Sequence, residues 1–536
     1  MYPLNMRMRH VNELVGLIAS LQLLYSPYAS LGSPVTTVVV PRILEERSDS
    51  EELVVAIRAG WTLALRKASV LPEQLEVTTL EQNTKTIHYM NGSRLEQNLY
   101  HDPQARAAVI LTRTRGLRLV GILSPTERIQ PSAAAGYGTR GSVEHDILPI
   151  SQRDSDAENS SHVFREGIDG YPDSALFEPS IQTAKKVLEA RSGASIYPLK
   201  ATCETRIAVD SKYFASFRRD KRKLAQYMAV LVAFTNLKFR TFQENILHFQ
   251  LSVTGIVIFS YDARETFISK WDEDPSVMLS ETLDKLNLYV KQESMFQKDD
   301  IVVFFTGLDL AMSYGTGKPP SQSIVGLAKV GTACGDYKAA IVEDIPRTFT
   351  SVLTMAHEIG HLVGSVHDGS PNDRSSVDPR TCPVGEKKIM APSLGTKMWQ
   401  AFSYCSTVQV AQFVMSDSGH CLTTNNTSKE SKKLTFADVN KTRPSLDEFC
   451  QRHYTEYTGT GYIKLSGKGL TLDKCVITCK VPERPSLVII NDAPDGMSCN
   501  DTRRRAICIN GRCTRIKDNR VETFGNDVKD SVVELR

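Results

Sequence analysis

No cysteine precedes Cys203 in this 536-residue chain, although the chain contains eleven cysteines in all. The sequence also lacks an excess of either charge, because 64 Lys and Arg residues face 61 Asp and Glu residues. Two basic runs, at 218–223 and 503–505, have no aromatic residues between their charges, and we interpret both as solvated surface. This composition gives no indication of a nucleic-acid partner.

Long apolar runs are absent beyond the amino terminus, where one extends from Leu14 to Leu24. Because a membrane-spanning helix needs about 20 apolar residues, no membrane span is expected. Basic residues precede this run and small residues follow it, which is the order found in a secretory signal. The sequence therefore predicts a signal peptide at residues 1–30 and a secreted, extracellular protein.

The distribution of cysteines and sequons favours the same compartment. Six cysteines lie near the carboxyl end, at Cys450, Cys475, Cys479, Cys499, Cys508 and Cys513. Such a cluster predicts a disulfide-bonded module, which forms in an oxidising compartment, and the sequence leaves its pairing open. Sequons for N-glycosylation begin at Asn91, Asn159, Asn425, Asn426, Asn440 and Asn500.

Residue patterns divide the chain into segments. Residues 35–150 are predicted to be mostly strands, because β-branched and alternating apolar residues recur there. Residues 151–195 are polar and acid-rich at first, which indicates a linker. From Ile196 apolar strands alternate with helical patterns, which predicts a mixed sheet covered by helices. A second linker is expected at 425–445, followed by the cysteine-rich module at 446–536.

One short segment, TMAHEIGHLVGSVHD at 354–368, holds three histidines and a glutamate. Its apolar spacing predicts a helix on which His357 and His361, four residues apart, share one face. Gly364 lets the chain leave this helix in a conformation that a β-carbon disfavours. His367, three residues further on, can then approach the other two histidines.

Three neutral imidazoles with an open fourth position predict a catalytic zinc site. A zinc ion there activates water and polarises a carbonyl group, and Glu358 is placed as the general base. The alternative is that His357, His361 and His367 are core residues of an ordinary amphipathic helix. The spacing H-E-x-x-H-x-x-G-x-x-H fixes the residue at five positions and favours the zinc site.

The extended motif resembles that of the metzincin metalloproteases, and Asp368 after the third histidine is similar to the reprolysin (adamalysin, ADAM-type) branch. The segment KIMAPS resembles the Met-turn of this family, which implies that Met390 lies beneath the zinc. The resemblance further implies an α/β (α+β) catalytic domain at 196–424, with a mixed, mostly parallel sheet and a zinc-binding active-site helix. The segment GLAKVGTAC resembles the family's substrate-binding edge strand, which would begin with Gly326, Leu327 and Ala328.

The same resemblance implies the disulfides Cys334–Cys421 and Cys382–Cys405, and it leaves Cys203 without a partner. It also implies a calcium (Ca²⁺) site formed by Glu204, Asp300 and the carbonyl of Cys421. Thr424 replaces the usual asparagine of that site, so plain surface charge stays open as the alternative reading of the two acids.

Residues 35–150 resemble the reprolysin prodomain, which acts as a chaperone and inhibitor, and prodomain and linker together are expected at 31–195. In many relatives a prodomain cysteine caps the zinc, but this prodomain has no cysteine. We hypothesise that latency is steric, or that Cys203 provides the cap. Removal of the prodomain is expected to require a cut between 150 and 198.

The carboxyl-terminal segments APDGMSC and CINGRC are similar to the cysteine-rich modules of ADAM-TS-like enzymes. The whole arrangement resembles the secreted salivary metalloproteases of blood-feeding arthropods. It implies the zymogen of a zinc (Zn²⁺) endopeptidase that cleaves extracellular-matrix or plasma proteins such as fibrinogen. The alternative is an integrin- or clotting-factor-binding protein that acts mainly through its tail on a cell-surface or plasma partner.

Overall fold

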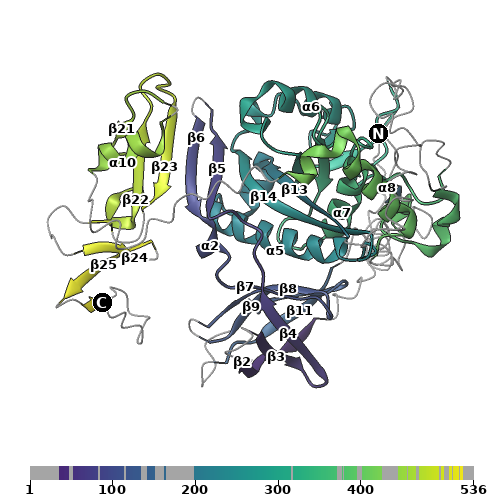
Figure 1. The fold of residues 1–536 in the computed structure, drawn as a ribbon, viewed down its shortest axis with the longest axis horizontal. Coiled ribbons are helices and arrows are strands. Elements are labelled where there is room, and N and C mark those ends of the chain that lie inside the picture. The colour runs from purple at the N-terminus through teal and green to yellow at the C-terminus, as the bar shows by residue number, and fades with distance from the viewer. Residues whose placement is uncertain are drawn as a thin grey trace, which may run out of the picture.

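The structure is a computed structural model that describes three parts of the chain. Residues 36–150 are called the amino-terminal part, 198–424 the central part and 445–522 the carboxyl-terminal part (Figure 1). The residues described are 36–47, 52–82, 85–113, 116–133, 142–150, 162–163, 198–315, 318–370, 377, 379–394, 401–424, 445–455, 457–465, 470–493, 497–499, 506–509, 511–517 and 520–522. The predicted signal peptide and the sequons at Asn159, Asn425, Asn426, Asn440 and Asn500 lie outside these ranges.

Most strands of the amino-terminal part form one nine-stranded antiparallel sheet. Alternating side chains of these strands bury a core of their own, in which Val55, Leu63 and Leu65 are fully enclosed. In sheet order the strands are β1 (Thr37–Val39), β11 (His145–Pro149), β10 (Glu127–Pro131), β9 (Arg118–Ser124), β8 (Ala107–Thr112), β7 (Leu99–Asp102), β4 (Trp61–Lys67), β3 (Glu52–Arg58) and β2 (Arg42–Arg47).

The central part confirms the mixed sheet with helices. Its strands β14 (Leu247–Phe259), β13 (Leu199–Val209), β16 (Ile301–Thr306) and β19 (Ala339–Glu343) run parallel, and β18 (Gly326–Leu327) closes the edge antiparallel to β19. Every residue of β16 and β19 is buried, as expected for parallel strands covered on both faces. The shorter strands are β15 (Val277–Leu279), β17 (Asp309–Ala311) and β20 (Ser393–Leu394), which pairs with β12 (His162–Val163).

Helices cover this sheet. They are α4 (Ser211–Ser216), α5 (Lys221–Phe239), α6 (Thr282–Gln292), α7 (Val352–Leu362) and α8 (Tyr404–Met415). Asp220 caps the first turn of α5, since its carboxylate accepts hydrogen bonds from the backbone N–H groups of Arg222 and Lys223. In the described ranges no helix is both long enough and apolar enough to cross a membrane.

A hairpin of the amino-terminal part extends the central sheet and joins it to the carboxyl-terminal part. This hairpin consists of β5 (Gln74–Leu80) and β6 (Lys85–Asn91), followed by the short helix α2 (Gly92–Leu95). A ten-stranded sheet results, in the order β18-β19-β16-β13-β14-β5-β6-β23-β22-β21. One sheet therefore contains strands of all three parts (Figure 1).

The carboxyl-terminal part is small and held by disulfides. Its elements are α10 (Leu446–His453), β21 (Gly461–Tyr462), β22 (Val476–Lys480), β23 (Leu487–Asp492), β24 (Ala506–Ile509), β25 (Arg512–Lys517) and β26 (Arg520–Glu522). The six cysteines pair as Cys450–Cys479, Cys475–Cys508 and Cys499–Cys513. Spacing along the chain gave no means of choosing this connectivity.

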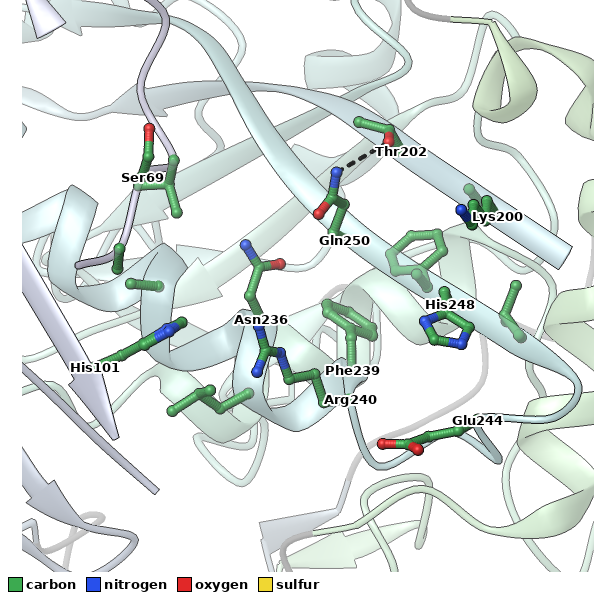
Figure 2. Close-up of a pocket in the computed structure, with 17 residues that line it drawn as sticks. Ser69, His101, Lys200, Thr202, Asn236, Phe239, Arg240, Glu244, His248 and Gln250 are labelled. Atoms are coloured by element: carbon green, nitrogen blue, oxygen red, sulfur yellow. Dashed lines mark hydrogen bonds between the residues drawn. The ribbon is translucent and has the colours of Figure 1, made fainter. Parts of the chain in front are cut away.

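A cavity of about 540 Å³ lies beside the contact between the nine-stranded sheet and the central part. Ser69 and His101 line it from the amino-terminal part, whereas Asn236 of α5, Arg240 directly after this helix and Gln250 of β14 line it from the central part (Figure 2). Away from this cavity, Ala108 and Ile122 of the nine-stranded sheet share one buried core cluster with α5.

Candidate metal centre and active site

Helix α7 carries the predicted motif and is held in place at its start by a buried carboxylate. One Asp344 oxygen accepts hydrogen bonds from the Ser351 backbone and the Thr350 hydroxyl, both at 3.0 Å. The other oxygen accepts from the hydroxyls of Tyr213 and Tyr227, at 2.6 and 2.8 Å. This network fixes the first turn of α7 against α4 and α5, and all eleven residues of α7 are buried.

The end of α7 turns as the sequence predicts. Gly364 has a φ of 98°, and the Gly364 and Ser365 N–H groups donate to the carbonyls of His361 and Gly360 at 2.9 Å. These two bonds form a glycine-centred helix cap, which reverses the chain toward His367. A β-carbon on Gly364 would also lie 2.9 Å from the Phe413 β-carbon of α8, so space as well as backbone conformation favours glycine.

The turn brings the three histidines together. Their Nε2 atoms lie 3.1, 3.1 and 3.2 Å apart for the pairs His357–His367, His357–His361 and His361–His367. Three nitrogens at zinc–nitrogen distances of about 2.0–2.1 Å around a tetrahedral ion lie roughly 3.3 Å apart. The spacing of the cluster therefore fits a zinc ion.

The hydrogen bonds of the imidazoles determine which nitrogen faces this centre. His357 Nδ1 lies 2.7 Å from the Ile389 carbonyl, and His361 Nδ1 lies 2.8 Å from the Ser365 carbonyl. A carbonyl only accepts, so each Nδ1 carries the proton and each Nε2 presents a lone pair. Burial and the neighbouring histidines lower the pKa of His357, and burial lowers the pKa of His361 to about 4, so both rings are neutral at pH 7.

Glu358 is buried next to the cluster and against the edge strand. A β-carbon built on Gly326 of β18 would lie only 2.4 Å from a Glu358 carboxylate oxygen and 2.6 Å from the Thr354 methyl group. Burial raises the pKa of Glu358 well above its usual range. The Glu358 carboxylate thus lies between α7 and β18. A base at this position can act on a peptide bond that lies along β18.

The edge strand is shorter than the predicted segment. Gly326 and Leu327 pair with Val342 and Ile341 of β19, and no further strand in the described residues pairs on their other side. Ala328 follows the strand and is buried. Beyond it the chain is tied to the end of α7, because the Gly331 N–H donates to the His361 carbonyl at 2.8 Å.

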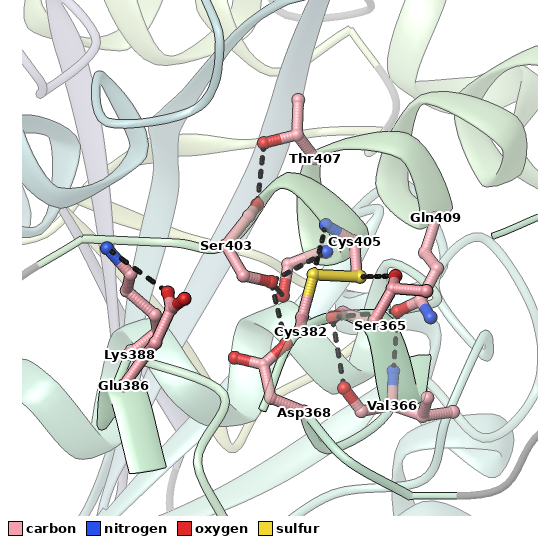
Figure 3. Close-up of a disulfide and its surroundings, with 12 residues drawn as sticks. Ser365, Val366, Asp368, Cys382, Glu386, Lys388, Ser403, Cys405, Thr407 and Gln409 are labelled. Atoms are coloured by element: carbon pink, nitrogen blue, oxygen red, sulfur yellow. Dashed lines mark hydrogen bonds and ion pairs between the residues drawn. A yellow bond between two sulfur atoms is a disulfide. The ribbon is translucent and has the colours of Figure 1, made fainter. Parts of the chain in front are cut away.

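Met390 and Asp368 pack against the elements that carry the histidine cluster. A β-carbon on Gly360 would lie 2.6 Å from the Met390 sulfur, so this side chain packs directly on α7. The Asp368 N–H donates to the Met390 carbonyl at 2.8 Å. The Ser403 hydroxyl donates to the Asp368 carboxylate at 2.6 Å (Figure 3). Burial raises the Asp368 pKa to about 6, although the Ser403 hydrogen bond opposes the shift.

Sequence reasoning did not identify Ser403 or Gln409 of α8. Gln409 accepts hydrogen bonds from the Ser365 hydroxyl at 3.2 Å and from the Val366 N–H at 3.1 Å, and so secures the turn before His367 (Figure 3). The disulfide Cys382–Cys405 fastens the chain before Met390 to α8. No local signal marks the contacts of Ser403 and Gln409, which join residues more than thirty positions apart.

The structure also describes the predicted disulfide of Cys334, the two acids of the predicted calcium site and the sequon at Asn91. Cys334 is bonded to Cys421, the pair that the resemblance implies. Asp300 accepts from the Glu204 N–H at 2.8 Å, and both acids are buried rather than on the surface. Asn91 is exposed, and its side chain accepts a hydrogen bond from the Arg94 N–H at 2.8 Å.

Cys203 lies in the core within β13, and burial raises its thiol pKa well above the usual range. In the described residues, the group of side chains that contains the three histidines and could share one metal ion does not contain Cys203. The hypothesis that Cys203 caps the zinc is therefore wrong for this conformation.

A buried cluster of three histidines beside an acid and an open sheet edge defines a metallopeptidase domain. Residues 200–403 match the family model Reprolysin_5, described as metallo-peptidase family M12. The central part is thus a reprolysin-type metalloprotease domain.

Similar proteins are known among curated sequences. An "A disintegrin and metalloproteinase with thrombospondin motifs like" protein of Bombyx mori is 26% identical over 45% of this chain and 34% of its own length. "Zinc metalloproteinase-disintegrin-like atrase-A" of Naja atra is 25% identical over 46% of this chain and 35% of its own. "Zinc metalloproteinase recombinant fibrinogenase II" of Deinagkistrodon acutus is 24% identical over 42% of this chain and 85% of its own. The chain spans about a third of the length of the first two relatives.

Proposed function

We propose that this chain is the zymogen of a secreted zinc-dependent endopeptidase. The observation that carries the proposal is the convergence of the three Nε2 atoms, 3.1–3.2 Å apart, beside the buried Glu358. His357, His361 and His367 hold the ion, which supplies a Lewis acid that activates water and polarises the scissile carbonyl. Glu358 accepts the proton of the attacking water and returns it to the leaving amine.

The substrate is an extended peptide segment. Its backbone adds to the open edge of β18 by strand pairing, which places a peptide bond over the glutamate. Gly326 leaves room for the Glu358 carboxylate at this position. Proteins of the extracellular matrix or plasma, such as fibrinogen, are the substrates we propose, and the relative from Deinagkistrodon acutus bears the name fibrinogenase.

Latency in this proposal is steric. Strand β12, at 162–163, pairs antiparallel with β20, which begins three residues after Met390. Residues 162–163 of the linker therefore lie along the segment that follows the metal centre, where they hinder entry of a substrate. Adding a thiol-modifying mercurial to the purified zymogen would contradict this view if activation were prompt.

Glu358→Gln tests the proposed activity. The variant keeps the three histidines but cannot accept a proton, so cleavage of a quenched fluorescent peptide library should fall at least about a hundredfold. Glu386→Gln is the matched control, because Glu386 is exposed and lies outside the cluster. Zinc content, measured by mass spectrometry, should be equal in both variants.

The alternative function is binding of an integrin or clotting protein through the carboxyl-terminal part. That part is small, loop-rich and held by three disulfides, which favours a role as a partner-binding surface. Glu358→Gln separates the two functions. A biological effect that survives undiminished in this variant would contradict proteolysis as the function, even with zinc bound.

A further inference from the structure

The hairpin β5–β6 occupies a slot between two strands that belong to the other parts of the chain. On one side β5 pairs parallel with β14, from Glu76 opposite Gly255 to Leu80 opposite Phe259. On the other side β6 pairs parallel with β23, from Lys85 opposite Leu487 to Tyr89 opposite Asn491. Both edges of the hairpin are therefore hydrogen-bonded, and Figure 1 shows it between the central and carboxyl-terminal parts.

Side chains of the hairpin belong to the cores of both neighbours. Leu75 and Val77 are fully buried in the same cluster as β13, β14 and α5 of the central part. Ile87 packs in the cluster of the carboxyl-terminal part, and the Tyr89 ring stacks on Tyr454 with centroids 5.7 Å apart. Withdrawal of the hairpin would expose all of these apolar surfaces to water.

Charges also cross both contacts. The Arg206 guanidinium of β13 lies 2.9 Å from Glu76 and 2.9 Å from Asp299, and its side chain is only 8% exposed. Without Glu76 this buried cation would lose one of its two carboxylates, which is costly in a protein interior. Removal of the hairpin therefore carries an electrostatic penalty as well as an apolar one.

At the other contact, Asp492 of β23 joins all three parts. It lies 3.3 Å from His88 of β6 and 2.8 Å from Arg222 at the start of α5. The interpretation of 218–223 as merely solvated surface is thus wrong for Arg222. In the described residues, strand pairing connects the carboxyl-terminal part to the rest through β6 alone.

We infer that the hairpin is a permanent strand pair of the mature protein, so that residues 36–150 stay bound after the chain is cut between 150 and 198. The inference takes only this cut from the proposed function. The interaction surface is the slot between β14 and β23, and its occupant is the amino-terminal part of the same chain. Access of a substrate to the metal centre then requires separation of β12 from β20, whereas the amino-terminal part keeps the central part joined to the carboxyl-terminal part.

The test uses the full chain with a recognition sequence for a site-specific protease inserted between 164 and 197. Glu358→Gln is included to prevent self-digestion, and a tag is placed at the carboxyl terminus. After the cut, size-exclusion chromatography and capture through the tag should recover both pieces together in equal amounts. Separate elution of the amino-terminal piece under native conditions would overturn the inference.

Glu76→Gln measures the contribution of the buried charge pair. In the cut protein it should speed dissociation of the amino-terminal piece at least about tenfold, because Arg206 is left with a neutral neighbour. Glu46→Gln is the control, since Glu46 pairs with Arg113 within the amino-terminal part and both are at least half exposed. Its effect should stay within about twofold. Equal dissociation rates in the two variants would contradict the assigned contact.

Hydrogen exchange shows whether the edges of β14 and β23 stay paired after the cut, and elution shows whether the hairpin is still their partner. If the hairpin remains, amides of 255–259 and 487–491 keep their protection after the cut. If the hairpin leaves and β23 closes on β14, protection survives although the amino-terminal piece elutes separately, and this outcome also overturns the inference. The same cut made with Glu358 intact reports peptide cleavage. Absence of cleavage would count against the proposed function and leave the co-elution result unaffected.

Discussion

The Glu358 carboxylate lies so close to Gly326 that a β-carbon at position 326 would be 2.4 Å from its oxygen. The two residues are on different elements, α7 and β18, and meet because the sheet edge passes over the helix that carries the histidines. Any side chain larger than that of glycine at position 326 would therefore displace the Glu358 carboxylate.

Gly326→Ala should lower kcat/KM for peptide cleavage at least about tenfold, because a carboxylate displaced by even 1 Å loses its alignment with the reacting water. Zinc content should stay the same, since no histidine is touched. Gly385→Ala is the control, because a β-carbon there meets nothing within 4 Å. Equal activity of the two variants would show that the carboxylate accommodates the methyl group.

The buried Lys238 should make the free energy of unfolding depend on pH. Its side chain is buried beside the Phe234 ring, and burial lowers its pKa from 10.5 to about 7. Between pH 7 and 10.5 the unfolded chain binds the proton that the folded chain has released, so the free energy of unfolding rises with pH. Below pH 7 both states are protonated, and the group's contribution is constant and least favourable.

Lys238→Met should therefore raise the unfolding midpoint in urea at pH 6 and flatten its increase between pH 7 and 10. Lys223→Met, at the exposed start of the same helix, should change neither quantity. A steep pH dependence that persists in Lys238→Met would assign it to another group.

The disulfide Cys382–Cys405 should stabilise both the fold and the metal centre. Replacing both cysteines by serine frees the segment before Met390 and should cost about 2–4 kcal/mol of unfolding free energy. Zinc should also be lost at a lower concentration of a competing chelator. Loss of Cys499–Cys513 in the carboxyl-terminal part serves as the comparison, and it should leave zinc retention unchanged.

Calcium at Glu204 and Asp300 stays a prediction that thermal unfolding can test. Burial raises the Asp300 pKa to about 7, and a nearby cation would stabilise its ionised form. Titration of calcium at fixed zinc should raise Tm in the native sequence but not in Asp300→Asn. Asp336→Asn, an exposed acid that pairs with Lys291, should respond like the native chain. A Tm that ignores calcium would make the prediction wrong.

Much of the metal centre was predictable because its information is local. The four-residue spacing of His357 and His361 and the glycine at 364 determine helix face and turn within a dozen positions of the chain. The positions of the parallel strands were equally predictable, as the continuous apolar run of β16 shows. Their bounds shifted by a few residues, and the predicted edge strand shrank to Gly326–Leu327.

The sequence by itself therefore determined the histidine cluster, its neighbouring acid and the mixed sheet that carries them, since each rests on short-range periodicity. Only the tertiary structure decided that Cys203 is a core residue and that Gln409 and Ser403 secure the site. It also decided that one sheet joins β14, β5, β6 and β23. Which strand edges meet across several hundred residues depends on the packing of complete surfaces, and no contiguous stretch of sequence encodes it.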